Sequence, residues 1–145
     1  MNISEIILEN KNYNRATIVF FSGDLGAGKT TNIKNICDYF GVIEHVSSPT
    51  YVIIQNYAAF KIFKNIIHID AYRLNSYSEL VKLRFEEMIG DVNNLILIEW
   101  PEQLKGVSVE ADMTIRIGHD SEKDNVRQVE ISAKGAIIAT YKYSY

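Results

Sequence analysis

The sequence holds little cysteine and no long hydrophobic run. Cys37 is the only cysteine among 145 residues, which excludes an intramolecular disulfide and any metal site built from several cysteines. No apolar stretch approaches the roughly 20 residues that a membrane-spanning helix needs. Residues 1–14 also lack the basic start and apolar core of a secretory signal. We therefore expect a cytoplasmic protein with no membrane partner.

An excess of positive charge is missing as well. The chain has 15 Lys and Arg against 18 Asp and Glu, a net charge of -3, and the basic residues are scattered along it. A protein that grips a nucleic-acid backbone by itself is usually basic, with its cations gathered on one face. Strong direct binding to RNA or DNA is therefore not expected, unless a partner protein supplies the contact.

What is present is the composition of a globular protein, with 47% apolar and 23% charged residues. No linker, repeat or low-complexity tract divides the chain, so we expect one domain over residues 1–145. The apolar run Ala16–Ser22 predicts a strand buried on both faces of a sheet. The apolar residues from Ile33 to Phe40 have the spacing of an amphipathic helix that Gly41 ends, with Cys37 on its buried side.

Further elements follow along the chain. Strands are predicted at Thr50–Tyr57, Ile66–Asp70, Leu95–Glu99, Ala111–Gly118, Arg127–Ala133 and Ile137–Tyr143. A helix is predicted over Tyr77–Ile89, with Ser76 and Glu79 at the spacing of a capping box. Together these elements predict an α/β fold, a three-layer domain with a mainly parallel sheet and antiparallel C-terminal strands.

The segment between the first strand and the first helix carries the clearest chemistry. It reads GDLGAGKT over Gly23–Thr30, the full G-x-x-x-x-G-K-[ST] pattern in the strand–loop–helix context that a P-loop NTPase requires. Glycines let backbone N–H groups approach phosphate oxygens, and the helix start adds its positive dipole end. Lys29 supplies charge to the β- and γ-phosphates, and Thr30 offers a hydroxyl to magnesium. The predicted phosphate-binding residues are Gly23, Asp24, Leu25, Gly26, Ala27, Gly28, Lys29, Thr30 and Thr31.

Two predicted strands end in an acid, Asp70 and Glu99. The carboxyl ends of parallel strands form the ligand crevice of α/β sheets, so both acids are expected to face the phosphates. One would hold magnesium and the other would orient or deprotonate the attacking water, in an order that the residues alone leave open. Ser47–Thr50 precedes the second strand, where Thr50 is either a switch residue that senses the γ-phosphate or part of a plain Ser-Pro turn.

Four segments, in this order, resemble one family. They are GDLGAGKTT from Gly23, SSPTY from Ser47, HIDAYRL from His68 and IEWPEQL from Ile98. The chain resembles the TsaE family, small bacterial ATPases required for threonylcarbamoyladenosine formation on tRNA. The resemblance spans about Ala16–Leu104.

The resemblance implies ATP and Mg²⁺ as cofactors, with Lys29 and its loop on the phosphates. It implies Thr30 and Glu99 as metal ligands, Asp70 as the water-orienting or basic residue, and Thr50 as the switch residue. Trp100 would be a functional neighbour of Glu99 that contacts the nucleotide, although packing beside Pro101 explains it equally well. The implied partners are TsaB and TsaD, and through them tRNA.

The resemblance also leaves differences. The family's N-terminal segment is normally longer and contains a helix, whereas here Tyr13–Arg15 is not expected to continue one. His68 is expected to be a core histidine rather than a metal ligand, and Arg127 to lie at the surface rather than on a base or phosphate.

Two other classes of protein fit the phosphate loop. A small-molecule or nucleotide kinase would usually add an Arg-bearing lid after Glu99, and no such insert is visible. A binding module would act by nucleotide occupancy with negligible hydrolysis. A GTPase is disfavoured because no N-K-x-D segment occurs.

Overall fold

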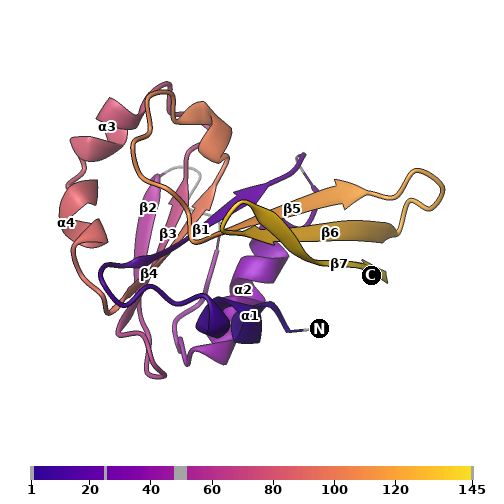
Figure 1. The fold of residues 1–145 in the computed structure, drawn as a ribbon, viewed down its shortest axis with the longest axis horizontal. Helices are drawn as coiled ribbons and strands as arrows, with labels where there is room; N and C mark the ends of the chain where they lie inside the picture. Colours follow the sequence, from indigo (N-terminus) through magenta and orange to yellow (C-terminus); the bar gives the residue numbers. More distant parts are fainter. Residues whose placement is uncertain (1, 25, 48–51, 145) are drawn as a thin grey trace.

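A mixed seven-stranded sheet organises the chain (Figure 1), in a computed structural model that describes residues 2–24, 26–47 and 52–144. Its strands run in the order β2-β3-β4-β1-β5-β6-β7. Their bounds are β1 Thr17–Ser22, β2 Ile54–Ala58, β3 Asn65–Asp70, β4 Asn94–Glu99, β5 Met113–His119, β6 Val126–Ala133 and β7 Ala136–Ser144. The predicted α/β fold with its antiparallel C-terminal strands is confirmed.

The centre of the sheet is parallel. Strands β3, β4, β1 and β5 run side by side in one direction, and β4 is buried along its whole length. Continuous apolar runs suit strands covered on both faces. The register pairs Asp70 with Glu99 and Glu99 with Phe21, so the carboxyl ends of three neighbouring strands meet at one edge.

Antiparallel strands complete both sides of this centre. On one side β5, β6 and β7 form an antiparallel meander. On the other side β2 pairs antiparallel with β3, to which a short loop joins it. The predicted strand Thr50–Tyr57 is too long at its start, because Ile53 has a φ of 68° and pairing begins only at Ile54. Thr50 lies outside the described residues.

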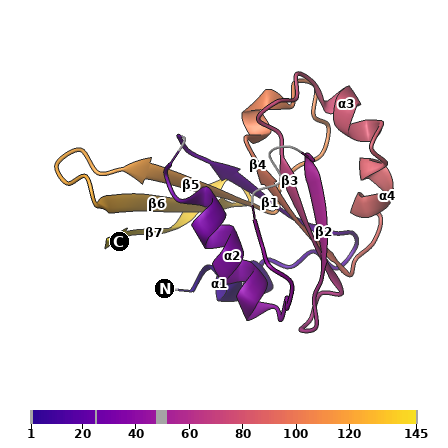
Figure 2. The same ribbon diagram turned by 180° about the vertical axis from the view of Figure 1, so that it is seen from behind.

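Helices cover the sheet on both faces, as Figures 1 and 2 show. Their bounds are α1 Ile3–Glu9, α2 Lys29–Tyr39, α3 Tyr77–Val81 and α4 Phe85–Ile89, followed by a 3-10 turn η1 at Pro101–Gln103. The first core cluster joins α1 and α2 to the sheet through residues such as Ile7, Ile33 and Phe21. The second joins α3 and α4 to the opposite face through Leu80 and Phe85. Among the described residues, no helix is long and apolar enough to cross a membrane.

The predicted helix Tyr77–Ile89 is wrong in its continuity. It is interrupted before α4, where Arg84 takes a left-handed conformation with a φ of 67°. Leu80 and Phe85 are both fully buried, yet five residues on one helix point about 140° apart, so the break lets both reach the same core. The capping box is also incomplete, because Glu79 accepts from the N–H of Asn75 and no side-chain cap comes from Ser76.

The segment before β1 contains a helix that the sequence analysis did not predict. In α1, the side chain of Asn2 accepts from the N–H of Ser4, and Ile3 and Ile7 lie one turn apart in the core. As expected, no helix continues through Tyr13–Arg15.

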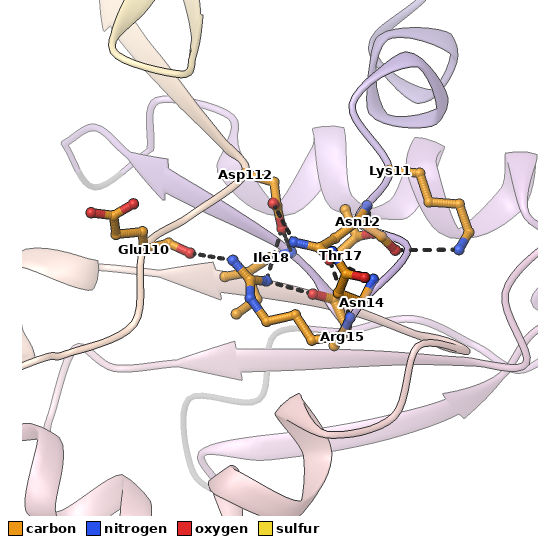
Figure 3. A network of polar contacts seen from close by, with 9 residues as sticks. Lys11, Asn12, Asn14, Arg15, Thr17, Ile18, Glu110 and Asp112 are labelled. Carbon is orange, nitrogen blue, oxygen red and sulfur yellow. Dashed lines mark hydrogen bonds and ion pairs between the residues drawn. The ribbon is translucent and has the colours of Figure 1, made fainter.

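A polar network fastens the segment between α1 and β1 (Figure 3). Asp112, just before β5, accepts from the N–H of Ile18 at 2.8 Å, from Arg15 Nη1 at 3.0 Å and from Asn12 Nδ2 at 3.0 Å. Arg15 also donates to the backbone oxygen of Glu110 at 2.9 Å. These contacts hold the entrance of β1, the strand that leads into the glycine-rich loop.

Candidate functional site

The glycine-rich loop leaves β1 at Ser22 and enters α2 at Lys29. Gly23, Gly26 and Gly28 have φ values of 150°, 77° and 103°, a range that side chains rarely tolerate. A Cβ on Gly23 would lie 2.3 Å from the backbone oxygen of Ile117. The loop therefore needs glycine both for its backbone conformation and for its close approach to β5.

Lys29, the first residue of α2, contacts the loop through its side chain. Its side chain is 6% exposed, and Nζ donates to the backbone oxygens of Gly23 and Asp24. Nζ also lies 3.7 Å from the ring centre of Trp100. Burial lowers the pKa of Lys29, and the negative charges around it, with Glu99 the largest, oppose that shift. Loss of water thus disfavours the charged form of Lys29, and the nearby carboxylates counteract that effect.

Glu99 ends β4 and contacts Thr30 in the first turn of α2. It is 3% exposed, and Thr30 Oγ1 donates to its Oε1 at 3.5 Å. Its other oxygen, Oε2, lies 2.7 Å from Nε2 of His68, a fully buried residue of β3. Each oxygen of the Glu99 carboxylate therefore has its own partner.

Asp70 lies beside Glu99 in register at the end of β3. It is buried, and its Oδ1 accepts from the N–H of Tyr72 at 3.0 Å. The N–H of Ala71 donates to the backbone oxygen of Glu99, which ties the two strand ends together. Both acids thus belong to the edge of the sheet that faces the loop.

Trp100 follows Glu99 and turns the chain away from β4. It has a φ of 58°, an uncommon conformation for a residue with a large side chain, and its backbone N–H donates to the backbone oxygen of Phe21. Its ring packs against Tyr72 at 5.0 Å between centres and against the ammonium of Lys29. The aromatic ring is therefore part of the loop's surroundings and does more than cover the core beside Pro101.

Two of these side chains, Thr30 and Glu99, have oxygen atoms that suit a divalent cation. No cluster of three or more His, Cys, Asp or Glu occurs in the described parts of the chain, so a cage made by the protein alone is not found there. One hydroxyl and one carboxylate, Thr30 and Glu99, are the few protein ligands that Mg²⁺ takes when phosphates and water complete its shell. The donors present fit a magnesium–nucleotide complex better than a free metal ion.

The structure brings most of the predicted site residues together. Lys29, Thr30, Glu99 and Trp100 are linked by the contacts above, and Asp70 is the register neighbour of Glu99. Thr31 is exposed in the first turn of α2. Leu25 and Thr50 lie outside the described residues.

A pocket of about 180 Å³ adjoins the loop on the side of β6 and β7. It is lined by Gly26, Ala27, Gly28, Thr31, Arg127 and Tyr143. The expectation that Arg127 lies at the surface is wrong. It is 4% exposed, and its guanidinium donates to the backbone oxygens of Asp124 at 2.7 Å and Gly26 at 3.5 Å.

Three residues of this region were missed by sequence reasoning. His68 is buried as expected, but it bonds Glu99 directly. Arg127 and Tyr143 reach the loop as a register pair of β6 and β7, about 100 residues after it. For His68 alone the sequence held a signal. It lies two residues before Asp70 in the HIDAYRL segment, and alternate residues of a strand share a face, so His68 is expected on the same face as Asp70.

Comparison with known proteins agrees with this architecture. The model of the family "Threonylcarbamoyl adenosine biosynthesis protein TsaE" matches residues 2–129. A TsaE protein of Haemophilus influenzae is 34% identical over 120 residues, covering 83% of this chain and 72% of that protein. One of Streptomyces coelicolor is 32% identical over 126 residues, covering 85% and 84%.

Similarity extends to solved structures. A crystal structure of YdiB from Bacillus subtilis superposes with a TM-score of 0.61 at 25% identity, covering 91% of this chain and 78% of that one. The family match spans the glycine-rich loop, both strand-end acids and the first half of β6. The chain therefore belongs to the TsaE family, whose members take part in the biosynthesis of threonylcarbamoyladenosine on tRNA.

Proposed function

We propose that this chain binds and hydrolyses ATP with Mg²⁺ and that it serves tRNA threonylcarbamoyladenosine formation together with TsaB and TsaD. The observation that carries the proposal is the junction of loop and sheet. There the buried Lys29, the hydroxyl of Thr30 and the carboxylate of Glu99 converge at the amino end of α2. Backbone N–H groups, a helix start and a buried ammonium are what a triphosphate needs.

The roles of the side chains follow from their positions. Lys29 would release the backbone oxygens of Gly23 and Asp24 and bind the β- and γ-phosphates instead. Thr30 and Glu99 would hold Mg²⁺, and the ion would supply positive charge that offsets the negative charge of the phosphates. Asp70, the register neighbour of Glu99, would orient or deprotonate the attacking water.

The order of the strands supports one orientation of a nucleotide bound along the loop. Glu99 and Asp70 end strands on one side of β1, whereas the pocket beside Thr31 lies toward β6 and β7 on the other side. A nucleotide across the loop would put its γ-phosphate near Glu99 and its nucleoside in the pocket, against Arg127 and Tyr143. Thr50 remains a proposed switch residue, and the cytoplasmic location rests on the sequence alone.

Phosphate release tests this function. Turnover of ATP by the purified chain should be slow alone and should rise when TsaB, TsaD and tRNA are added together. Release that ignores these additions would contradict the role in the assembly. Phosphoryl transfer to an added nucleoside or metabolite would indicate a kinase. Tight ATP binding without release, even with the partners, would indicate a module that works by occupancy.

A further inference from the structure

His68 is a fully buried titratable side chain to which the proposed ATP chemistry assigns no role. It lies on β3 with its partner in register at Leu97, two residues before the pair of Asp70 and Glu99. Alternate strand residues share a face, so His68 and Glu99 are diagonal neighbours on the side of the sheet that α2 covers. The contact between them is short, 2.7 Å from Nε2 to Oε2.

The contact with Glu99 bears on which ring nitrogen of His68 carries the proton. An ionised carboxylate only accepts hydrogen bonds, so the tautomer of His68 that matches an ionised Glu99 carries its proton on Nε2. The other ring nitrogen, Nδ1, has no hydrogen-bond partner among the described residues. Nε2 is therefore the atom through which His68 contacts Glu99.

The contact with His68 also determines where the second oxygen of Glu99 lies. A glutamate side chain has three rotatable bonds, and anchoring Oε2 leaves Oε1 as the oxygen that faces Thr30 Oγ1. Mg²⁺ demands near-ideal octahedral geometry, and residues that hold a ligand in place tune metal affinity. We propose that His68 is a positioning residue that fixes Glu99 for a divalent cation, an inference that rests on the proposed nucleotide function.

Two near-matched substitutions test this role. Gln places an amide N–H close to the position of Nε2, whereas Asn places one nearer to Nδ1, and both are polar. His68→Gln should retain the affinity for Mn²⁺ of the ADP-bound protein, measured from the loss of the free Mn²⁺ signal by electron paramagnetic resonance. His68→Asn should lower that affinity about 10- to 100-fold. Affinity for ADP in the presence of EDTA should be unchanged in both.

A second background separates positioning from general damage. In a Glu99→Ala protein His68 has nothing left to position, so adding His68→Asn should change Mn²⁺ affinity little further. Equal Mn²⁺ affinities of His68→Asn and the parent protein would overturn the inference, and so would an undiminished effect in the Glu99→Ala background. If the parent protein binds no ADP, the proposed nucleotide function fails. If it binds ADP with Mn²⁺ but ignores His68→Asn, only the role of His68 fails.

Discussion

Lys29 carries its charge in a place that favours a phosphate. Its ammonium is buried at the start of α2, where burial lowers its pKa and neighbouring carboxylates partly restore it. Its present partners are two backbone oxygens and the face of Trp100. A phosphate group brings full negative charge to this buried cation, and charge-assisted hydrogen bonds are about twice as strong as neutral ones. The residue is therefore suited to binding an anion.

Replacing Lys29 by Ala should weaken ATP binding about 10- to 100-fold, which corresponds to one charged hydrogen-bond partner. The measurement is the dissociation constant of ATP by calorimetry or by the fluorescence of Trp100, the only tryptophan in the chain. Lys34→Ala is the matched control, because Lys34 is an exposed lysine on the same helix. Equal affinities in the two variants would be incompatible with a phosphate at Lys29.

At the scale of single residues, sequence alone predicted what lies close together in the chain. Lys29 and Thr30 stand in one motif, and Glu99 and Asp70 were predicted because strand ends meet at one edge of a parallel sheet. The bond from His68 to Glu99 was not predicted, since it depends on how β3 is registered against β4. The burial of Arg127 was missed because it depends on where β6 lies beside the glycine-rich loop.

Strand β7 places an aromatic side chain, Tyr143, beside the loop, where it forms one wall of the pocket. A Cβ on Gly28 would lie 2.7 Å from the hydroxyl of Tyr143, and Asn32 donates to that hydroxyl at 3.4 Å. Stacking of a base on an aromatic side chain contributes about 1–3 kcal/mol. Tyr143→Ala should therefore lower ATP affinity about tenfold and leave the affinity for inorganic tripolyphosphate unchanged, both measured by calorimetry.

Tyr141 supplies the control for that experiment. It lies two residues earlier on β7, packs against the core on the α2 side and does not line the pocket beside Thr31. Tyr141→Ala disturbs the same strand without removing the proposed wall. If it weakens ATP binding as much as Tyr143→Ala does, or if tripolyphosphate binding falls in parallel, the nucleoside does not lie against Tyr143.

The elements that were predicted well are those with a strong local pattern. The unit of β1, loop and α2 combines an apolar run, a glycine-rich motif and helical spacing. Prediction failed where packing overrides that pattern. The break at Arg84 is required by two buried side chains on one sheet face, and the short α1 is stabilised by packing beside α2 more than by its own seven residues.

At the scale of the whole molecule, the site depends on segments that are far apart in the chain. The strand order places β1 between β4 and β5, so the loop is flanked by residues from both halves of the sequence. The network around Asp112 joins the approach to β1 with the approach to β5, almost 100 residues later (Figure 3). No local sequence pattern predicts this pairing, yet the contacts of Asp112 hold β1, the strand that leads into the loop.

Removing this network should destabilise the fold and leave the site chemistry intact. Asp112→Ala leaves the N–H of Ile18 and the guanidinium of Arg15 without their carboxylate acceptor, which should lower the free energy of unfolding by about 2–3 kcal/mol. Urea unfolding of the nucleotide-free protein measures this loss.

Glu110→Ala is the control for this prediction. Arg15 bonds the backbone oxygen of Glu110, which the substitution keeps, so its effect should stay within about 0.5 kcal/mol. The hydrogen bonds of Asp112 go to Asn12, Arg15 and Ile18, and none reaches a described residue of the loop, so ATP affinity of the folded Asp112→Ala protein should match that of the parent. A fall in affinity at unchanged stability would mean that Asp112 belongs to the nucleotide site and not to its support.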